Sequence, residues 1–430
     1  MGPPRSDRRR HPTQGAPGQP SRPQGAVPPM CASCTTDLRQ LSTDFVRNPY
    51  PVYAKLRARG PVHHVRPPDG PEVYLVVGYE ACRAALTDPR LSRDWRKSGD
   101  VSRIANTSPD DPSLAHMALS DPPDHTRLRR LVAREFTTRR IEALAPRVQE
   151  ITDTLLDEMT ANGARKADLV AAVAFPLAMT VICELLGVPE LDRESFRRWS
   201  NEILAPTGRE AEATAYTEQA EYLPRLIGAK RADPGEDLLS ALIHTVDEDG
   251  DRLSPDELIG MCSLLLIAGH ETTVNLIGNG MRALFAHPDQ LDLLRADPSL
   301  AGNAVEEILR YDGPVESAQE RLALEDIEMG GMLIPAGATV RIVLAAADRD
   351  AARFDDPDRF DIRRDTRGHI AFGHGLHHCL GAPMGRLEGR IAIRTLLERC
   401  PGITADTDMT DLDWVPGMLL RGVRELPVRW

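Results

Sequence analysis

The chain has 430 residues, of which 41% are hydrophobic, enough to bury the core of one large domain or of two or three ordinary ones. Its formal net charge of −12 argues against general binding to nucleic acids. The longest apolar run, 264–268, is far shorter than the roughly 20 residues that span a bilayer, so no membrane anchor is expected. Seven cysteines without a regular framework favour reduced thiols and a cytoplasmic location.

The first 36 residues are rich in Pro and Arg and lack the apolar stretch of a signal peptide, so we predict a disordered tail. Met30, near the end of this tail, is a candidate for the true start of the protein. Cys31 and Cys34 form a lone CxxC motif; without a second pair of ligands at zinc spacing we expect neither metal binding nor redox chemistry there. Residues 37–430 are predicted to form a single domain.

The rest of the chain predicts an α+β fold that is mainly α, with small β-sheets at its edge. Residues 62–65 and 72–77 flank a Pro/Gly/Asp turn and predict a β-hairpin. The pattern is then mostly helical to about residue 323. Further short strands are expected at 327–329, 332–334 and 339–345. The segment 348–378 shows no periodicity and is unusually long for an irregular connection, which indicates a functional loop.

A basic helix is expected to begin near His125, behind Asp121-Pro122-Pro123. His125 and Arg129 are four residues apart, so both can point at one anionic group, for which carboxylates are the natural candidates. The alternative is a solvated basic face, which could also dock an acidic protein.

Residues 255–286 predict one helix of about 48 Å, with Ser254 as its N-cap. Its middle is apolar all round, as in a buried helix, yet 268–273 read Ala-Gly-His-Glu-Thr-Thr and place an acid and two hydroxyls there. Thr hydroxyls can bond back to a carbonyl one turn earlier, and a glycine leaves room for a ligand. The alternative is a kinked helix whose threonines satisfy themselves. On a later helix, Glu307 and Arg310 can share hydrogen bonds, although such a pair alone is usually solvated.

Cys379 lies in the sequence Phe-Gly-His-Gly-Leu-His-His-Cys-Leu-Gly, 372–381, which precedes a helical pattern. The glycines leave room for a flat group against the backbone, and main-chain amides can turn toward the sulfur. A helix N-terminus also favours negative charge, so the sequence predicts a thiolate metal ligand beneath a planar iron macrocycle. The alternative is a glycine-rich loop with a buried free cysteine.

In this order, HxxxR, AGxET, ExxR and FGxGxHxCxG resemble the motifs of the cytochrome P-450 heme-thiolate monooxygenases, over roughly residues 37–430. Residues 120–140 and 268–281 are most similar to soluble actinomycete enzymes that hydroxylate macrolide polyketides. The resemblance implies a single cytochrome P-450 fold, with the long central helix over heme b and the cysteine loop beneath it.

The resemblance also implies roles for individual residues. Cys379 would be the axial ligand of the heme iron. Four side chains would hold the heme propionates: His125, Arg129, Arg321 and His377. Three would form a buried triad that braces the cysteine loop: Glu307, Arg310 and Arg359. Glu271 and Thr272 would be the acid and the alcohol that deliver protons to oxygen.

Two positions depart from the family pattern. Asp348-Arg349-Asp350-Ala351 stands where many relatives have Asn-Arg-Asp-Pro, a difference that we expect to be structural only. His378, just before the cysteine, is expected to be solvated or to face a partner rather than to bind the metal.

No flavin or iron–sulfur motif accompanies these residues, so O2 is expected as cosubstrate and the electrons are expected from a separate ferredoxin and ferredoxin reductase. Four arginines are expected on the face that docks an acidic ferredoxin: Arg129, Arg130, Arg134 and Arg386.

The lid segments would be 93–118 and about 195–225, and their scarcity of aromatic residues favours a large hydrophobic small molecule, such as a macrolide or other polyketide. Four acids are candidates to meet an amino sugar, although acids on polar loops are usually only solvated: Asp69, Asp100, Asp110 and Asp111. Hydroxylation is the expected reaction. The alternatives are epoxidation or ring closure, a different natural product, and a heme-binding sensor without turnover.

Overall fold

The computed structural model describes residues 1–2, 35–38, 44–68, 70–98, 111–204, 207–246 and 250–430. Most of the predicted tail therefore lies outside the described residues, and so do Met30, Cys31 and Cys34. The compact unit begins at Thr35 rather than at residue 37. The reason is a short parallel pairing, in which Thr36 already lies opposite Val65.

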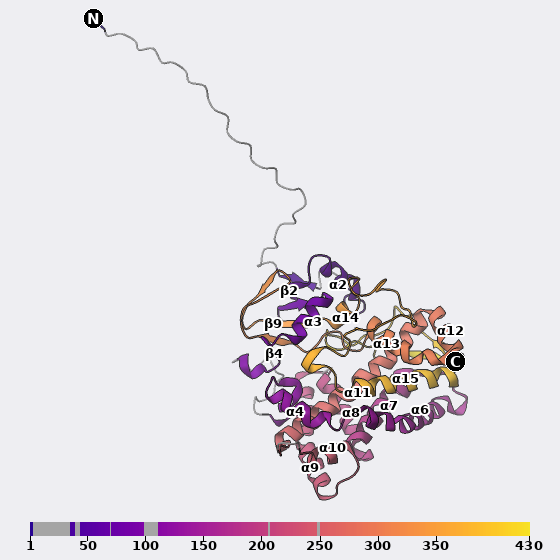
Figure 1. Cartoon of the computed structure of the whole chain (residues 1–430). Helices are drawn as coiled ribbons and strands as arrows, with labels where there is room; N and C mark the ends of the chain where they lie inside the picture. Colours follow the sequence, from indigo (N-terminus) through magenta and orange to yellow (C-terminus); the bar gives the residue numbers. More distant parts are fainter. Residues whose placement is uncertain (3–34, 39–43, 69, 99–110, 205–206, 247–249) are drawn as a thin grey trace. The chain divides into compact units, whose positions relative to one another are not determined.

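Helices make up most of this unit (Figure 1). They are α2 (Tyr50–Arg57), α3 (Tyr79–Thr87), α4 (Asp124–Ala133), α5 (Thr138–Ala143), α6 (Ala145–Thr160), α7 (Phe175–Leu186), α8 (Arg193–Leu204), α9 (Arg209–Ala232), α10 (Leu238–His244), α11 (Pro255–Ala286), α12 (Pro288–Ala296), α13 (Ala301–Asp312), α14 (Leu344–Ala347) and α15 (Ala382–Arg399). The predicted mainly α fold class is confirmed.

The strands form one larger and two small sheets. The larger sheet has the order β1 (Thr36–Asp37), β2 (Val62–Arg66), β3 (Val73–Val76), β9 (Thr339–Ile342), β6 (Arg321–Ala323) and β4 (Leu91–Ser92). The second has the order β10 (Thr404–Ala405), β11 (Pro427–Arg429) and β5 (Lys166–Asp168), and the third pairs β7 (Ile327–Met329) with β8 (Met332–Ile334).

The predicted hairpin is the antiparallel pair β2 and β3, which confirms the interpretation of the turn between them. The strands expected after residue 326 are β7, β8 and the first part of the predicted 339–345 segment, whose second part is helical in α14. Six strands of two or three residues were not predicted, because so few residues carry no periodicity: β1, β4, β5, β6, β10 and β11.

The long helix α11 has the predicted bounds, and Ser254 is its N-cap. The Ser254 side chain accepts the N–H of Glu257 at 3.2 Å, and the Glu257 carboxylate accepts the N–H of Ser254 at 2.8 Å. The helix contacts α7, α13 and α15, and Figure 1 shows it inside the helical part of the unit, away from β2, β9 and β4. The middle of α11, rather than either end, is therefore the part that a ligand inside the unit would meet.

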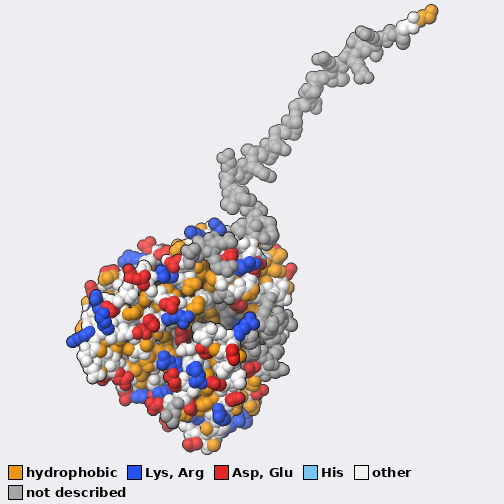
Figure 2. All heavy atoms as spheres, turned by 180° about the vertical axis from the view of Figure 1, so that it is seen from behind, with side chains coloured by type: hydrophobic (Ala, Val, Ile, Leu, Met, Phe, Trp, Pro, Cys, Tyr) orange, Lys and Arg blue, Asp and Glu red, His pale blue; other side chains and the backbone are white. Residues whose placement is uncertain are grey.

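The surface carries both signs of charge. On the face shown in Figure 2, Lys and Arg side chains are interspersed with Asp and Glu, and apolar atoms lie between them. Within the part of the chain that the structure describes, we find no helix that is both long enough and apolar enough to cross a membrane.

Candidate active site

The cysteine loop differs from the surroundings of the other cysteines. Among the five cysteines in the described residues, Cys379 is exposed and the other four are buried. Its N–H donates to the carbonyl of Phe372 at 2.8 Å, which closes the loop. Gly375 has φ +75°, and a Cβ there would lie 2.6 Å from Cγ2 of Thr87, so this turn requires glycine. The loop therefore keeps one thiol accessible.

Two opposing influences act on the pKa of the Cys379 thiol. The low-polarity environment raises the pKa of Cys379, whereas the N–H groups of Gly381 and Ala382 and the guanidinium of Arg129 lower it. Two of these opposing groups, Gly381 and Ala382, are the cap and the first residue of α15, as the predicted helix N-terminus requires. Arg129 is held beside the loop, because it donates to the carbonyl of His378 at 2.7 Å. These donors suit a thiolate that binds a cation.

A cluster of basic side chains close to the loop carries several nitrogens that have no partner among the described residues. The imidazole rings of His125 and His377 are 4.3 Å apart, and both ring nitrogens of His125 are buried without a hydrogen bond. Nε of Arg93 and both Nε and Nη2 of Arg321 are likewise buried and unpartnered among the described residues. Burying such groups without acceptors is costly, so their arrangement fits an anionic ligand.

The pKa values of the basic groups in this cluster are lowered by burial, and few negative charges lie near them to oppose this lowering. Burial, followed by Arg93, His125 and Arg321, lowers the pKa of His377 to about 2. Burial and the neighbouring Arg321 lower the pKa of Arg93 to about 9, and burial lowers that of Arg321 to about 10. The carboxylate that opposes these shifts is Asp121, which Lys97 and Ser92 already engage. The two propionates of a heme would supply the missing acceptors.

Arg93 is the member of this cluster that sequence reasoning missed as a ligand residue. It stands at the start of the segment interpreted as a lid, and no motif marks it. It follows the two-residue strand β4, which pairs with β6 beside Arg321, and a strand this short gives no signal in the sequence.

The centre of α11 is open where its neighbours are buried. Ala268 is exposed, whereas Leu265, Leu266 and Thr273 around it are buried. Leu380, which follows the cysteine, packs against the hydrophobic cluster to which Leu265 and Leu266 also belong, so the loop and α11 share one core. The open alanine fits the flat group expected between them.

Glu271 and Thr272 lie beside this opening. The Thr272 hydroxyl donates to the carbonyl of Ala268 at 3.0 Å, the bond predicted from the sequence. The Glu271 side chain is 18% exposed. Burial raises the pKa of its carboxyl, and the Asn275 amide and Arg424 oppose the rise.

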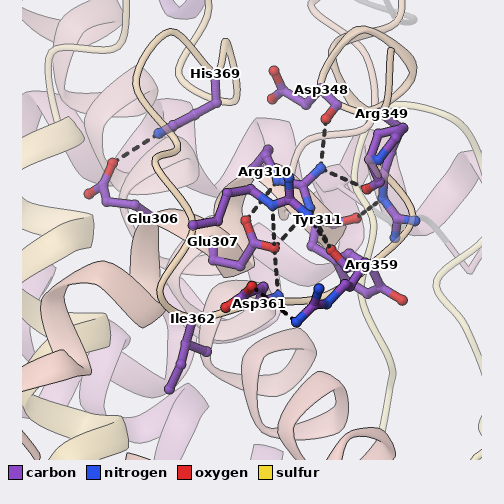
Figure 3. Close-up of polar contacts among 12 residues, drawn as sticks. Glu306, Glu307, Arg310, Tyr311, Asp348, Arg349, Arg359, Asp361, Ile362 and His369 are labelled. Atoms are coloured by element: carbon purple, nitrogen blue, oxygen red, sulfur yellow. Dashed lines mark hydrogen bonds and ion pairs between the residues drawn. The ribbon is translucent and has the colours of Figure 1, made fainter. Parts of the chain in front are cut away.

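Glu307 and Arg310 form a buried pair rather than a solvated one. Two bonds of 2.7 and 2.8 Å join the carboxylate to the guanidinium, and both side chains are fully buried. Nη1 of Arg310 also donates to the carbonyls of Asp348 and Pro357, at 3.0 and 2.8 Å. Figure 3 shows Arg310 between Glu307 and the backbone oxygen of Asp348. The pair thereby fixes the irregular segment that leads to Cys379.

The prediction for Arg359 is wrong in one respect. Its side chain is 65% exposed and faces Asp361 at 3.4 Å, and only its carbonyl accepts from Arg310. The third side chain of the brace is Arg364, whose Nε lies 3.3 Å from Oε1 of Glu307. A segment without periodicity gives no rule for which arginine side chain points inward. Here the chain makes a turn at Asp361, and Arg364, which follows it, points inward.

Part of the predicted lids lies outside the described residues, namely 99–110 and 205–206, and so do Asp69, Asp100 and Asp110. Asp111 is described, and its carboxylate accepts the N–H of Ser113 at 2.8 Å as the cap of a short helix. His378 is exposed, in keeping with a solvated or partner-facing ring.

The accessible Cys379, the acid and the alcohol on α11 and the unpartnered basic nitrogens are the groups that a heme-thiolate protein requires. The Cytochrome P-450 family profile matches residues 295–421. The chain is 57% identical to the cytochrome P-450 monooxygenase PikC of Streptomyces venezuelae, covering 92% of this chain and 94% of that protein. It is 47% identical to the 6-deoxyerythronolide B hydroxylase of Saccharopolyspora erythraea, covering 88% of this chain and 95% of that protein.

A solved structure agrees with the sequences. The tirandamycin C-bound monooxygenase TamI superposes with a TM-score of 0.83 at 44% identity, covering 92% of this chain and 99% of that one. The chain therefore belongs to the cytochrome P-450 family. It is a monooxygenase whose cofactor is a heme with cysteine-ligated iron, related to macrolide and polyketide hydroxylases.

Proposed function

We propose that this protein hydroxylates a macrolide or another large polyketide in the cytoplasm. The observation that carries the proposal is the similarity, over nearly the whole chain, to a hydroxylase of 6-deoxyerythronolide B and to a monooxygenase that binds tirandamycin C. The exposed Ala268 in α11 supports it, because a small residue there leaves room for a bulky ligand beside Glu271 and Thr272.

Cys379 is the proposed axial ligand, and the basic cluster is the proposed propionate site. His125, His377, Arg321 and Arg93 would supply the unpartnered donors that two carboxylates need. Arg129 acts between this cluster and the loop, since its guanidinium bonds to the carbonyl of His378 and lies near Cys379. The buried pair of Glu307 and Arg310, with Arg364, holds the loop in place.

The heme, when bound, supplies the activation of O2 and the oxidation of the substrate carbon. The residues of α11 deliver protons to the site. These are needed because reducing the second oxygen atom to water consumes two protons and two electrons. Burial raises the pKa of the Glu271 carboxyl and so favours its protonated form, and the Thr272 hydroxyl, already donating to Ala268, has lone pairs that accept from it or from a water. The buried apolar residues around them exclude bulk water.

The electrons are proposed to come from an acidic ferredoxin and its reductase. Arg129 and Arg386 both lie near the cysteine loop, and Arg386 is 39% exposed while its guanidinium bonds to Glu306 at 2.6 Å. We expect turnover with a ferredoxin to weaken as salt rises. Coupling that does not depend on salt would count against this docking face.

The substrate is tested by titrating the purified heme protein with a panel of macrolides, linear polyketides, terpenoids and small aromatics, and following the spin shift of the heme spectrum. Product analysis with a surrogate ferredoxin system then locates the inserted oxygen. We expect one or more macrolides to shift the spectrum and to gain a hydroxyl group. A shift with a terpenoid or aromatic compound alone would overturn the substrate class, and tight heme binding without product from any compound would favour a sensor.

The ligand assignment is tested separately with Cys379→Ser. The variant should lose the thiolate-type spectrum of the carbonyl complex. If it keeps that spectrum, Cys379 is not the ligand.

A further inference from the structure

Glu271 has two polar neighbours on α11, His270 and Asn275, and each carries a buried nitrogen without a well-formed hydrogen bond among the described residues. His270 is fully buried, and its Nε2 has no partner among the described residues. Asn275 is 3% exposed, and its Nδ2 is likewise unpartnered. The three residues occupy adjacent positions or adjacent turns of α11, at i−1, i and i+4. Unpartnered groups this deeply buried call for an explanation.

The hydrogen bond of the other ring nitrogen fixes the tautomer of His270. Nδ1 lies 3.0 Å from the carbonyl of Leu266, and because a carbonyl can only accept, Nδ1 must carry the hydrogen. Burial lowers the pKa of His270 to about 4, so the ring is neutral near pH 7. Nε2 is then a bare acceptor, and it lies 3.9 Å from Oε2 of Glu271. Phe175 packs edge-on against the ring, with the centroids 6.0 Å apart, and limits its movement.

The amide nitrogen of Asn275 is a hydrogen-bond donor, whereas Nε2 of His270 is an acceptor. Nδ2 of Asn275 can only donate, and it is near enough to Glu271 to oppose the rise of the pKa of that carboxyl. Gly422 makes room for this side chain, because a Cβ there would overlap Oδ1 of Asn275 at 1.9 Å. The amide is therefore confined beside the carboxyl.

One form of Glu271 matches both neighbours. A neutral carboxylic acid has an O–H for Nε2 of His270 and a carbonyl oxygen for Nδ2 of Asn275. A carboxylate only accepts, so it would leave the lone pair of His270 facing negative charge. We propose that His270 is a positioning residue that favours Glu271 as the neutral acid, with its proton on the oxygen that faces His270, and that Asn275 orients the other oxygen.

The charges around Glu271 do not reverse this preference. Arg424, from the C-terminal segment, acts on Glu271, but it is paired with Asp413 at 3.4 Å. On α8, Arg197 stacks on Phe175 at 4.6 Å, and the edge of the same ring packs against His270. On α7, Glu184 is engaged by Arg147. Burial, the largest influence on the carboxyl, raises its pKa. The use of this proton in catalysis rests on the proposed function, whereas the protonation state does not.

Infrared difference spectroscopy of the resting, heme-loaded enzyme tests the proposal, because protonated and ionised carboxyl groups absorb separately. Subtracting the Glu271→Gln spectrum from that of the wild type at pH 7 should leave a protonated-carboxyl band. In His270→Phe the same band should titrate about one pH unit lower, since the acceptor that faces the carboxyl proton is lost. His270→Gln, whose side-chain oxygen can accept, should restore much of the wild-type titration.

Glu388 supplies the matched control. It is a second buried acid, on α15, and burial raises its pKa as well. The Glu388→Gln difference band should titrate identically with and without His270→Phe. The proposal is overturned if Glu271→Gln removes no protonated band at pH 7, or if His270→Phe leaves the titration of that band unchanged. Because the band is measured without substrate or turnover, a failed macrolide assay would sink the proposed function and leave this result standing.

Discussion

Two buried sets of charges in this protein differ in one respect, and the difference separates a structural device from a binding site. Around Glu307 and Arg310, the guanidinium donates to the carboxylate and to backbone carbonyls of the segment before the cysteine loop. Around Arg93, Arg321 and His125, buried nitrogens have no acceptor. Both sets are equally hidden from solvent. A completed network holds the fold, whereas an incomplete one fits a ligand with the missing charge.

The largest expected effect comes from breaking the completed network. Arg310→Ala leaves the Glu307 carboxylate buried without its main partner, and we expect a loss of about 3–5 kcal/mol in the free energy of unfolding. Denaturant unfolding of the heme-loaded protein measures this loss. The control is Arg367→Ala, which removes a guanidinium that is 89% exposed and paired with Asp365, and it should not change stability measurably. Equal effects of the two variants would contradict the structural role of the brace.

Removing a cation from the incomplete network should weaken heme binding rather than the stability of the fold. In Arg321→Ala, a hydrogen-bonded charge to a propionate is lost, so heme dissociation should accelerate about 10- to 100-fold. The rate of heme transfer to an excess of apomyoglobin measures it. The far-UV circular dichroism should stay that of the wild type, because the substitution also relieves repulsion with Arg93. A variant that unfolds but retains heme as tightly as the wild type would reverse the comparison.

Variants of Arg364 and Arg359 test which of these two arginines belongs to the completed network. Arg364→Gln removes a contact to Glu307 and donors to the carbonyls of Asp356 and Arg359, and should cost about 1–2 kcal/mol of stability. Arg359→Gln removes a mostly exposed side chain and should change stability by less than about 0.5 kcal/mol. Thermal unfolding of both variants decides between them. A larger cost at Arg359 would restore the assignment made from the sequence.

The smallest effect concerns one acid in the completed network that has no cation of its own. Asp348 is buried, accepts the N–H of Ile370 at 2.8 Å, and burial raises the pKa of its carboxyl to about 7. In the unfolded chain this carboxyl ionises near pH 3.8, so between these two values the folded chain binds more protons and its stability falls as pH rises.

Asp348→Asn keeps the accepting oxygen and removes the ionisation. We expect it to stabilise the protein by about 1 kcal/mol at pH 8, and by less at pH 5, where the folded carboxyl is still neutral. Melting temperatures across this pH range measure the difference. A gain that does not depend on pH would show that the carboxyl does not titrate near neutrality.

The elements that sequence reasoning found are those with a periodic signal. The apolar positions, the Ser254 cap and the proline after it fixed both ends of α11, and the alternation on either side of a turn fixed β2 and β3. The motifs likewise marked Glu307, Arg310 and Cys379 as candidates, and the structure brings the first two into one buried pair. In these places local sequence and tertiary structure agree, so local rules suffice.

The failures lie where the outcome depends on residues far apart in the chain. Between 348 and 378 no period tells which arginine turns inward, so Arg359 was chosen and Arg364 missed. Arg93 carries no motif, and its buried Nε, which has no acceptor among the described residues, comes beside Arg321 only once β4 pairs with β6. The missing partners of His270 and Asn275 are also a property of packing, because each residue alone is unremarkable in a buried helix.

The parallel pairing of β3 with β9 has a consequence for the order in which this chain assembles during synthesis. Val76 lies opposite Ile342, so the larger sheet cannot be completed until α11 and α13 have left the ribosome. The next strand in that sheet, β6, carries Arg321. Contacts between such distant segments form late, because the intervening loop must first be closed. We therefore expect the nascent chain to capture its cofactor near the end of translation, after its helices have formed.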